Sequence, residues 1–102
     1  MKITIQYFEG CPHWNLADKR VKNALRDSAR EDVELEYQLI DSPEAAERAR
    51  FRGSPSILID GRDPFAVGDE AFGMSCRVYR TAEGTQGAPT EAQLRALLAT
   101  SA

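Results

Sequence analysis

The sequence predicts a single α/β domain over residues 1–102, in which three helices cover a mixed four-stranded sheet. With 102 residues, 42% of them hydrophobic, the chain can build one core and has no room for a second domain. Segments that alternate with a period of two are interleaved with segments that repeat every three or four residues, which gives the order β-α-β-α-β-β-α. Because a helix joins the first two strands, we expect them to be parallel, with a right-handed crossover.

The first half of the chain predicts two strands and the helix between them. Apolar and polar residues alternate over residues 2–8, as in a strand with one buried face. Apolar residues then recur at three- and four-residue steps, which predicts an amphipathic helix over about 12–29. Residues 33–39 alternate again, and their polar face is typical of an edge strand.

A short helix and a compact strand follow. The sequence Ser-Pro-Glu at 42–44 is a helix start, since serine caps the helix and proline is tolerated in the first turn. This helix is expected to run to about residue 50, before Gly-Ser-Pro at 53–55 stops it. Residues 56–60 then form an apolar strand that ends in an Asp-Gly turn.

The last third of the chain leaves the fourth strand open between two segments. Either 64–67 or 78–80 can return as the hairpin partner of the preceding strand, and 83–87 is expected to be a loop. Thr90 and Gln93 have the spacing of a capping box and open the last helix.

Composition excludes several classes of function. Thirteen basic and 16 acidic side chains give a net charge of −3, and a pI near 5.1 argues against a nucleic-acid surface. No apolar run approaches the roughly 18 residues of a membrane span. The first residues form an amphipathic strand rather than a secretory segment, so we expect a cytoplasmic protein.

The sequence Gly-Cys-Pro-His-Trp at residues 10–14 carries the chemistry, where the first strand gives way to the first helix. With Pro12 at the first helical position, Cys11 is the predicted N-cap, a place that Ser, Thr, Asp or Asn usually takes. There the sulfur would face unpaired N–H groups and the positive end of the helix dipole, which favour the nucleophilic thiolate. A protonated His13 would also favour the thiolate form of Cys11. The alternatives are a small buried side chain for Cys11 and an exposed polar residue for His13.

A strand followed by Cys-Pro-His, with Ser54-Pro55 before a later strand, resembles the thioredoxin-like superfamily. Most of the chain shares the element order, although only these two short motifs carry the resemblance. It implies a thioredoxin-like fold and a thiol–disulfide oxidoreductase with Cys11 as the attacking thiolate. It also implies a cis proline at Pro55 beside that thiol, and a substrate-binding region that we assign to Pro12, Trp14, Ser54 and Pro55.

The chain departs from that family at Trp14, which stands where the usual dithiol has its second cysteine. One thiol can attack a disulfide or be trapped by glutathione, but it lacks a local partner to release the adduct. We therefore expect a monothiol or otherwise divergent member. Pro55 has no N–H to offer a neighbouring strand, and a cis bond would turn the backbone of Ser54 toward the sulfur. The alternative is a trans proline that opens an edge strand.

Cys76 is the only other cysteine, and two are too few for a disulfide-stapled scaffold. We hypothesise that it is the resolving thiol. If 64–67 is the fourth strand, the chain returns toward Cys11. If 78–80 is that strand, the two sulfurs lie roughly 15 Å apart, too far for a bond. A buried structural thiol is the alternative.

Three functions follow, in order of preference. The first is thiol–disulfide exchange on a protein disulfide or a low-molecular-weight thiol, without a cofactor and with glutathione as a candidate co-substrate. The second is a catalytically decayed module that docks a protein partner. The third is the handling of a soft metal or an organomercurial by Cys11, His13 and Cys76, although their spacing predicts no metal site. The oligomeric state is not indicated.

Overall fold

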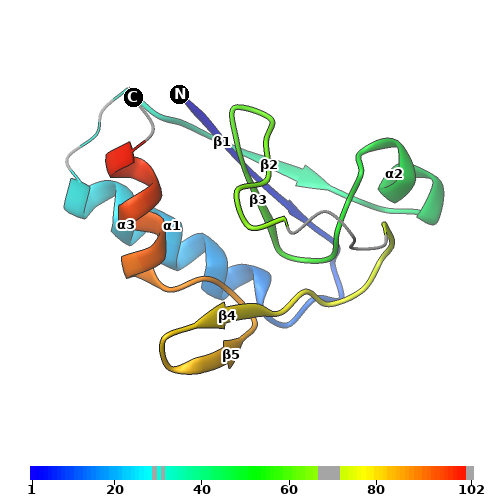
Figure 1. Cartoon of the computed structure of the whole chain (residues 1–102). Coiled ribbons are helices and arrows are strands. Elements are labelled where there is room, and N and C mark those ends of the chain that lie inside the picture. Colours follow the sequence, from blue (N-terminus) through cyan, green and yellow to red (C-terminus); the bar gives the residue numbers. More distant parts are fainter. Residues whose placement is uncertain (29, 31, 67–71, 101–102) are drawn as a thin grey trace.

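A three-stranded sheet forms the centre of the protein, in the order β2-β1-β3 (Figure 1). The computed structural model describes residues 1–28, 30, 32–66 and 72–100. The central strand β1 (Lys2–Tyr7) pairs in parallel with β2 (Glu34–Leu39) and antiparallel with β3 (Ser56–Ile59). The mixed sheet and the parallel pairing of the first two strands are therefore confirmed.

The three predicted helices are also confirmed, with small shifts at their ends. They are α1 (Trp14–Ser28), α2 (Pro43–Arg48) and α3 (Glu91–Thr100). Ser42 caps α2 through its hydroxyl, which accepts a hydrogen bond from the Ala45 N–H at 3.1 Å. Arg50 has a φ of +53°, outside the helical region, so α2 ends before it.

A capping box opens α3 as its sequence predicts. The N–H of Gln93 donates to the hydroxyl of Thr90 at 3.1 Å, and the N–H of Thr90 donates to the Gln93 side chain at 2.8 Å. Both hydrogen bonds are local, which is why the spacing alone identifies this helix start.

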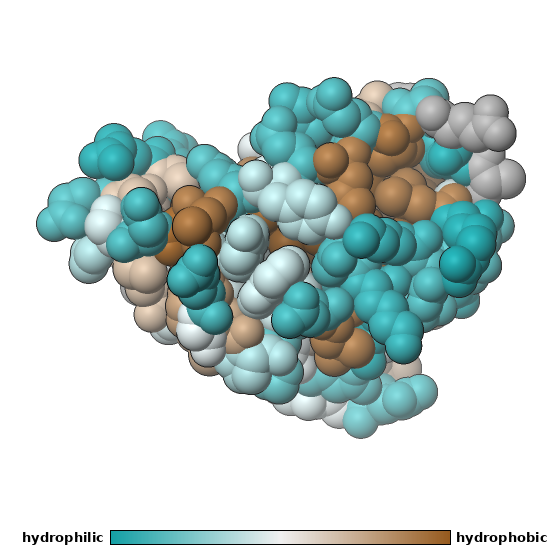
Figure 2. Space-filling model, turned by 180° about the vertical axis from the view of Figure 1, so that it is seen from behind, coloured by the Kyte–Doolittle hydropathy of each residue, from teal (hydrophilic) through white to brown (hydrophobic). Residues whose placement is uncertain are grey.

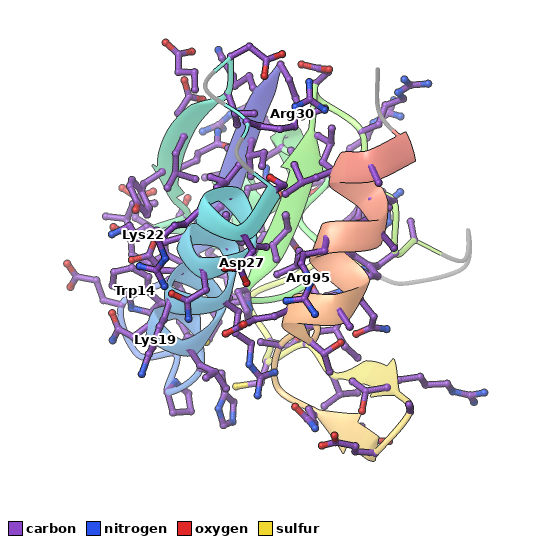
Figure 3. The ribbon with its side chains drawn as sticks, turned by 90° about the vertical axis from the view of Figure 1, so that its left-hand side faces the viewer. Trp14, Lys19, Lys22, Asp27, Arg30 and Arg95 are labelled. Atoms are coloured by element: carbon purple, nitrogen blue, oxygen red, sulfur yellow. The ribbon has the colours of Figure 1, made fainter. Side chains whose placement is uncertain are left out.

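The main core lies between the sheet and the helices α1 and α3, which pack side by side (Figures 1 and 3). Ile5 and Ile57 are opposite one another on β1 and β3, and both are fully buried. Val21 on α1 and Leu94 on α3 belong to the same cluster. Each such side chain contributes about 1.5–3 kcal/mol on burial, so the core positions of the alternating and helical patterns hold the domain together.

A second, smaller cluster holds the other end of the sheet. Ile40, Ala46 and Phe51 are buried together, and Phe8 packs against them. These residues tie α2 to the segments that follow β1 and β2. The turn after β1 carries Cys11, which is buried but belongs to neither cluster.

The sheet of the described residues has three strands, so the four-stranded sheet is wrong. Neither predicted segment pairs with β3, and only a single bridge, between Ile59 and Arg62, follows that strand in the described residues. Residues 79–81 form β4 (Tyr79–Thr81), which pairs with β5 (Gly84–Gln86) in a separate sheet. The predicted loop at 83–87 thus contains a strand, and Val67 lies outside the described residues. Tyr79 is fixed through its side chain, which is buried, rather than through a ladder with β3.

Hydrophobic side chains reach the surface in separate groups among hydrophilic ones on the face shown in Figure 2. Large exposed ones include Tyr37 and Leu39 on β2, and Phe72, Met74 and Val78 in the segment before β4. In the described ranges, no helix combines the length and the apolar character that crossing a membrane requires.

Candidate functional site

Cys11 lies in the turn between β1 and α1 and is buried, with 4% of its surface exposed. Its N–H donates to the carbonyl of Phe8 at 3.1 Å, which closes the turn. Its thiol lies 3.5 Å from the carbonyl oxygen of Ser54, to which it donates. The Cys11 sulfur thus contacts the segment that precedes β3.

Cys11 is not the N-cap of α1, and that prediction is wrong. The helix begins at Trp14, and its first backbone hydrogen bond runs from the Ala17 N–H to the His13 carbonyl at 3.1 Å. Proline at position 12 therefore lies in the turn instead of in the first helical turn. The polar group that the sulfur contacts is the Ser54 carbonyl, not the start of the helix.

Ser54 is the residue at which the site converges. It is completely buried, and its peptide bond to Pro55 is cis, the isomer that we expect at this position. The Ser54 N–H donates to the Ser75 carbonyl at 2.8 Å, and its carbonyl accepts from the Arg77 N–H at 2.9 Å. Its hydroxyl is buried without a hydrogen-bond partner in the described part of the chain. Segment 75–77 of the same chain therefore pairs with both backbone groups of Ser54, and the carbonyl accepts the Cys11 thiol as well.

The pairing of Ser54 with segment 75–77 places Cys76 at the site. It forms a parallel bridge with Ser54, and its side chain is exposed. From the Cys11 sulfur, one step of 3.5 Å reaches the Ser54 oxygen and a second of 2.9 Å reaches the Arg77 nitrogen, which is bonded to Cys76. With the bonds from that nitrogen to the Cys76 sulfur added, the two sulfurs lie within about 13 Å of one another. Among the described residues neither predicted hairpin is present, and both cysteines lie beside Ser54.

A buried ion pair anchors segment 75–77. The Arg77 guanidinium contacts the Asp63 carboxylate through Nη1–Oδ2 at 2.5 Å and Nη2–Oδ1 at 3.2 Å, and the two side chains are 7% and 3% exposed. Nη1 also donates to the hydroxyl of Ser56 at 3.1 Å. Such bidentate, charge-assisted pairs fix geometry as well as charge. This ion pair fixes the position of segment 75–77, and therefore the point at which Cys76 lies beside Ser54.

Gly53 allows the close approach of this segment. A Cβ at position 53 would stand 3.0 Å from the Ser75 oxygen and 3.1 Å from the Arg77 Cβ, and the φ of +111° favours glycine. The sequence marks this glycine only as a helix stop, so its role in packing was not predicted.

Tyr79 borders the site and is buried. Its hydroxyl donates to the Pro55 carbonyl at 2.5 Å, and its ring meets Phe65 edge to face at 5.1 Å. Burial raises the pKa of Tyr79 well above its usual value; the charges of Asp63 and Cys11 add to this, while Arg77 opposes it. The hydroxyl therefore remains a neutral donor that holds the backbone of Pro55.

The other predicted site residues lie around α1, and the described contacts do not bring them to the sulfur. His13 is exposed, and its ring lies against Gly87, where a Cβ would come within 2.4 Å of the ring. Trp14 stacks on Tyr7 with ring centroids 4.3 Å apart, and Figure 3 shows it on the side of α1 away from α3. Pro12 is exposed. Their roles in tuning and substrate binding stay predictions.

Arg77 and Asp63 belong to the site but were not predicted. They lie 14 positions apart in segments without regular periodicity, and the only signal in the sequence is a basic residue directly after Cys76. Across residues 1–28, 30, 32–66 and 72–100, no group of three or more His, Cys, Asp or Glu side chains could hold a metal ion. The soft-metal function remains a prediction without a site in these residues.

Comparisons with protein-family models, with curated proteins and with solved structures find no match for this chain. Membership of the thioredoxin-like superfamily therefore stays a prediction. We therefore infer the function from the geometry around Ser54.

Proposed function

We propose that the protein is a thiol–disulfide oxidoreductase whose Cys11 and Cys76 alternate between two free thiols and one internal disulfide. The observation that carries this proposal is the convergence of both cysteines on Ser54, through the sulfur of Cys11 and through the backbone of Cys76. Neither Cys11 nor Cys76 forms a disulfide in the structure.

The difference in exposure favours Cys76 as the thiol that meets the substrate. Cys76 is exposed, whereas Cys11 is buried. The Cys76 thiolate attacks the substrate disulfide, whose sulfur–sulfur bond breaks. One substrate sulfur leaves as a thiolate and takes up a proton, and the other stays on Cys76 as a mixed disulfide.

Cys11 then completes the cycle. Its thiolate attacks the Cys76 sulfur, the mixed disulfide breaks, and the second substrate thiol is released. The substrate disulfide is thereby reduced by two electrons, and the protein dithiol is oxidised to the Cys11–Cys76 disulfide. Two molecules of a thiol such as glutathione would reduce it again. Since the sulfurs must approach to about 2 Å, segment 75–77 has to shift against Ser54.

Single-cysteine variants distinguish this order from the one that the sequence favours, in which Cys11 attacks first and Cys76 resolves. With oxidised glutathione, Cys11→Ser should form a mixed disulfide rapidly through Cys76. Cys76→Ser should react slowly, because its remaining thiol is buried. The opposite ranking would restore the order expected from the sequence.

The proposal is tested by limited oxidation of the folded protein. The reduced chain is treated with substoichiometric oxidised glutathione, alkylated, and mapped by mass spectrometry. We expect a peptide pair joined through Cys11 and Cys76, and its absence in both serine variants. If only glutathione adducts or intermolecular dimers form, the internal cycle is excluded. If neither thiol exchanges under native conditions, the non-catalytic docking module becomes the better explanation.

A further inference from the structure

A pocket of about 610 Å³ lies beside Cys76. Its lining includes Cys76, the aromatic side chains of Phe65 and Tyr79, and three arginines, at positions 52, 77 and 80. No acidic side chain is among the described residues that line it. Its volume falls in the range of small-molecule sites, roughly 300–1,000 Å³. The exposed thiol thus opens onto a cavity that is large enough for a small ligand and lined by cations.

The arginines differ in how they are held. Arg77 is buried and paired with Asp63, so it forms part of the fixed wall. Arg52 lies over the ring of Phe72, with its guanidinium carbon 5.4 Å from the ring centroid, and its Nη1 also lies 3.9 Å from the Asp63 carboxylate. Arg80 is exposed, and its carbonyl accepts a hydrogen bond from the Gln93 side chain at 2.9 Å. The backbone of Arg80 is therefore fixed, while its guanidinium stays accessible at the pocket.

We propose that this pocket binds the carboxylate groups of a small anionic disulfide and presents its sulfur–sulfur bond to Cys76. Guanidinium groups bind carboxylates in bidentate geometry, and the neighbouring aromatic rings cover the apolar part of such a ligand. This inference rests on the proposed function, because it takes Cys76 as the thiol that meets the external disulfide.

The pairing of Ser54 favours a small substrate over an extended protein segment. A peptide that added itself to Ser54 as a strand would need the N–H and the carbonyl that already bond to Ser75 and Arg77. A small disulfide needs neither group, since Cys76 lines the pocket and Ser54 is not among its lining residues. A protein segment that pairs with Ser54 would have to displace segment 75–77 first.

The reaction at the pocket is the first step of the cycle. The Cys76 thiolate forms a bond to one sulfur of the bound disulfide, the sulfur–sulfur bond breaks, and the departing thiolate takes a proton from water. The carboxylates of the adduct remain on the arginines. The product is a mixed disulfide that Cys11 can then resolve.

Three small disulfides of different charge test the inference on the full chain. They are oxidised glutathione, which is anionic, hydroxyethyl disulfide, which is neutral, and cystamine, which is cationic. The rate of mixed-disulfide formation at Cys76 is followed by quenching and peptide mapping, in the natural protein, in Arg80→Gln and in the control Arg95→Gln. Arg95 lies on α3 and faces Asp27 on α1 (Figure 3), outside the residues that line the pocket.

We expect Arg80→Gln to slow oxidised glutathione about threefold, the factor for two unit charges about 6 Å apart in water. The neutral disulfide should be unaffected and cystamine accelerated, while Arg95→Gln should change none of the three. Added salt should weaken the preference of the natural protein for oxidised glutathione, a readout that needs no variant. Equal effects of Arg80→Gln on all three disulfides, or no effect, would overturn the inference.

This outcome is separable from that of the proposed function. Charge selectivity is read at Cys76 alone and does not need the second cysteine. Selective labelling without any Cys11–Cys76 disulfide would support the pocket and exclude the internal cycle. An internal disulfide that forms without charge selectivity would do the reverse.

Discussion

Replacing Asp63 by asparagine removes the charge that balances Arg77 while keeping the shape of the side chain. Both side chains are buried, so the loss leaves a guanidinium in the interior without its carboxylate. Breaking a buried pair by removing one partner costs about 3–5 kcal/mol. The amide oxygen of the new side chain can still accept the Phe65 N–H, which now donates to Asp63 at 3.0 Å. We therefore expect the lower end, about 3 kcal/mol of unfolding free energy.

Urea unfolding at pH 7, followed by circular dichroism, measures this loss, and thermal unfolding should show a fall in Tm of about 12 °C or more. Asp27→Asn is the matched control, because Asp27 makes the same kind of pair with Arg95 at 3.4 Å on the surface. An exposed pair contributes at most about 1 kcal/mol, so this variant should unfold almost like the natural protein. If Asp63→Asn costs no more than Asp27→Asn, the ion pair does not anchor segment 75–77 as argued.

Three further predictions concern the core, the close approach at Gly53 and the buried hydroxyl of Tyr79. Ile57→Val should cost about 1 kcal/mol and Ile57→Ala about 2–5 kcal/mol in urea unfolding, and equal costs would contradict tight packing there. Gly53→Ala should destabilise more than Gly61→Ala, because both have positive φ but only the first alanine would collide with segment 75–77. Since burial raises the pKa of Tyr79, its contribution to stability should be complete below about pH 10 and lost as the pH rises above that value. Tyr79→Phe should therefore lose less stability than the natural protein between pH 8 and pH 11, and an equal loss in both would refute the assignment.

The parts of the fold that could be predicted are those fixed by local pattern. Alternation over residues 2–8, the helical repeat after it and the two cap motifs each reflect contacts within one element, so one sequence suffices to find them. The prediction of a fourth strand was wrong because side-chain contacts, rather than strand pairing, determine the course of the chain after β3. Tyr79 bonds to Pro55 and Arg77 to Asp63, and neither contact leaves a period in the sequence.

The candidate site was predicted in part. The resemblance placed Ser54 and Pro55 beside Cys11, and the structure brings the Cys11 sulfur to the Ser54 carbonyl. The N-cap was wrong because proline at position 12 is compatible with a turn as well as with a first helical turn, and only the hydrogen bonds decide where α1 begins. The place of Cys76 beside Ser54 depends on a pairing across 22 residues, which no short motif encodes.

The edge strand β2 has a consequence for the protein at high concentration. Its outer side is the end of the described sheet, where the backbone of another molecule could add. At one end of this strand, Glu34 and Glu36 both pair with Lys2. Addition of another strand there would remove water from these charged groups, which costs free energy and so opposes the addition. At the other end Tyr37 and Leu39 carry no charge and are more than two-fifths exposed. Self-association through strands would therefore start from the Tyr37 end, and the ionic end limits how far it spreads.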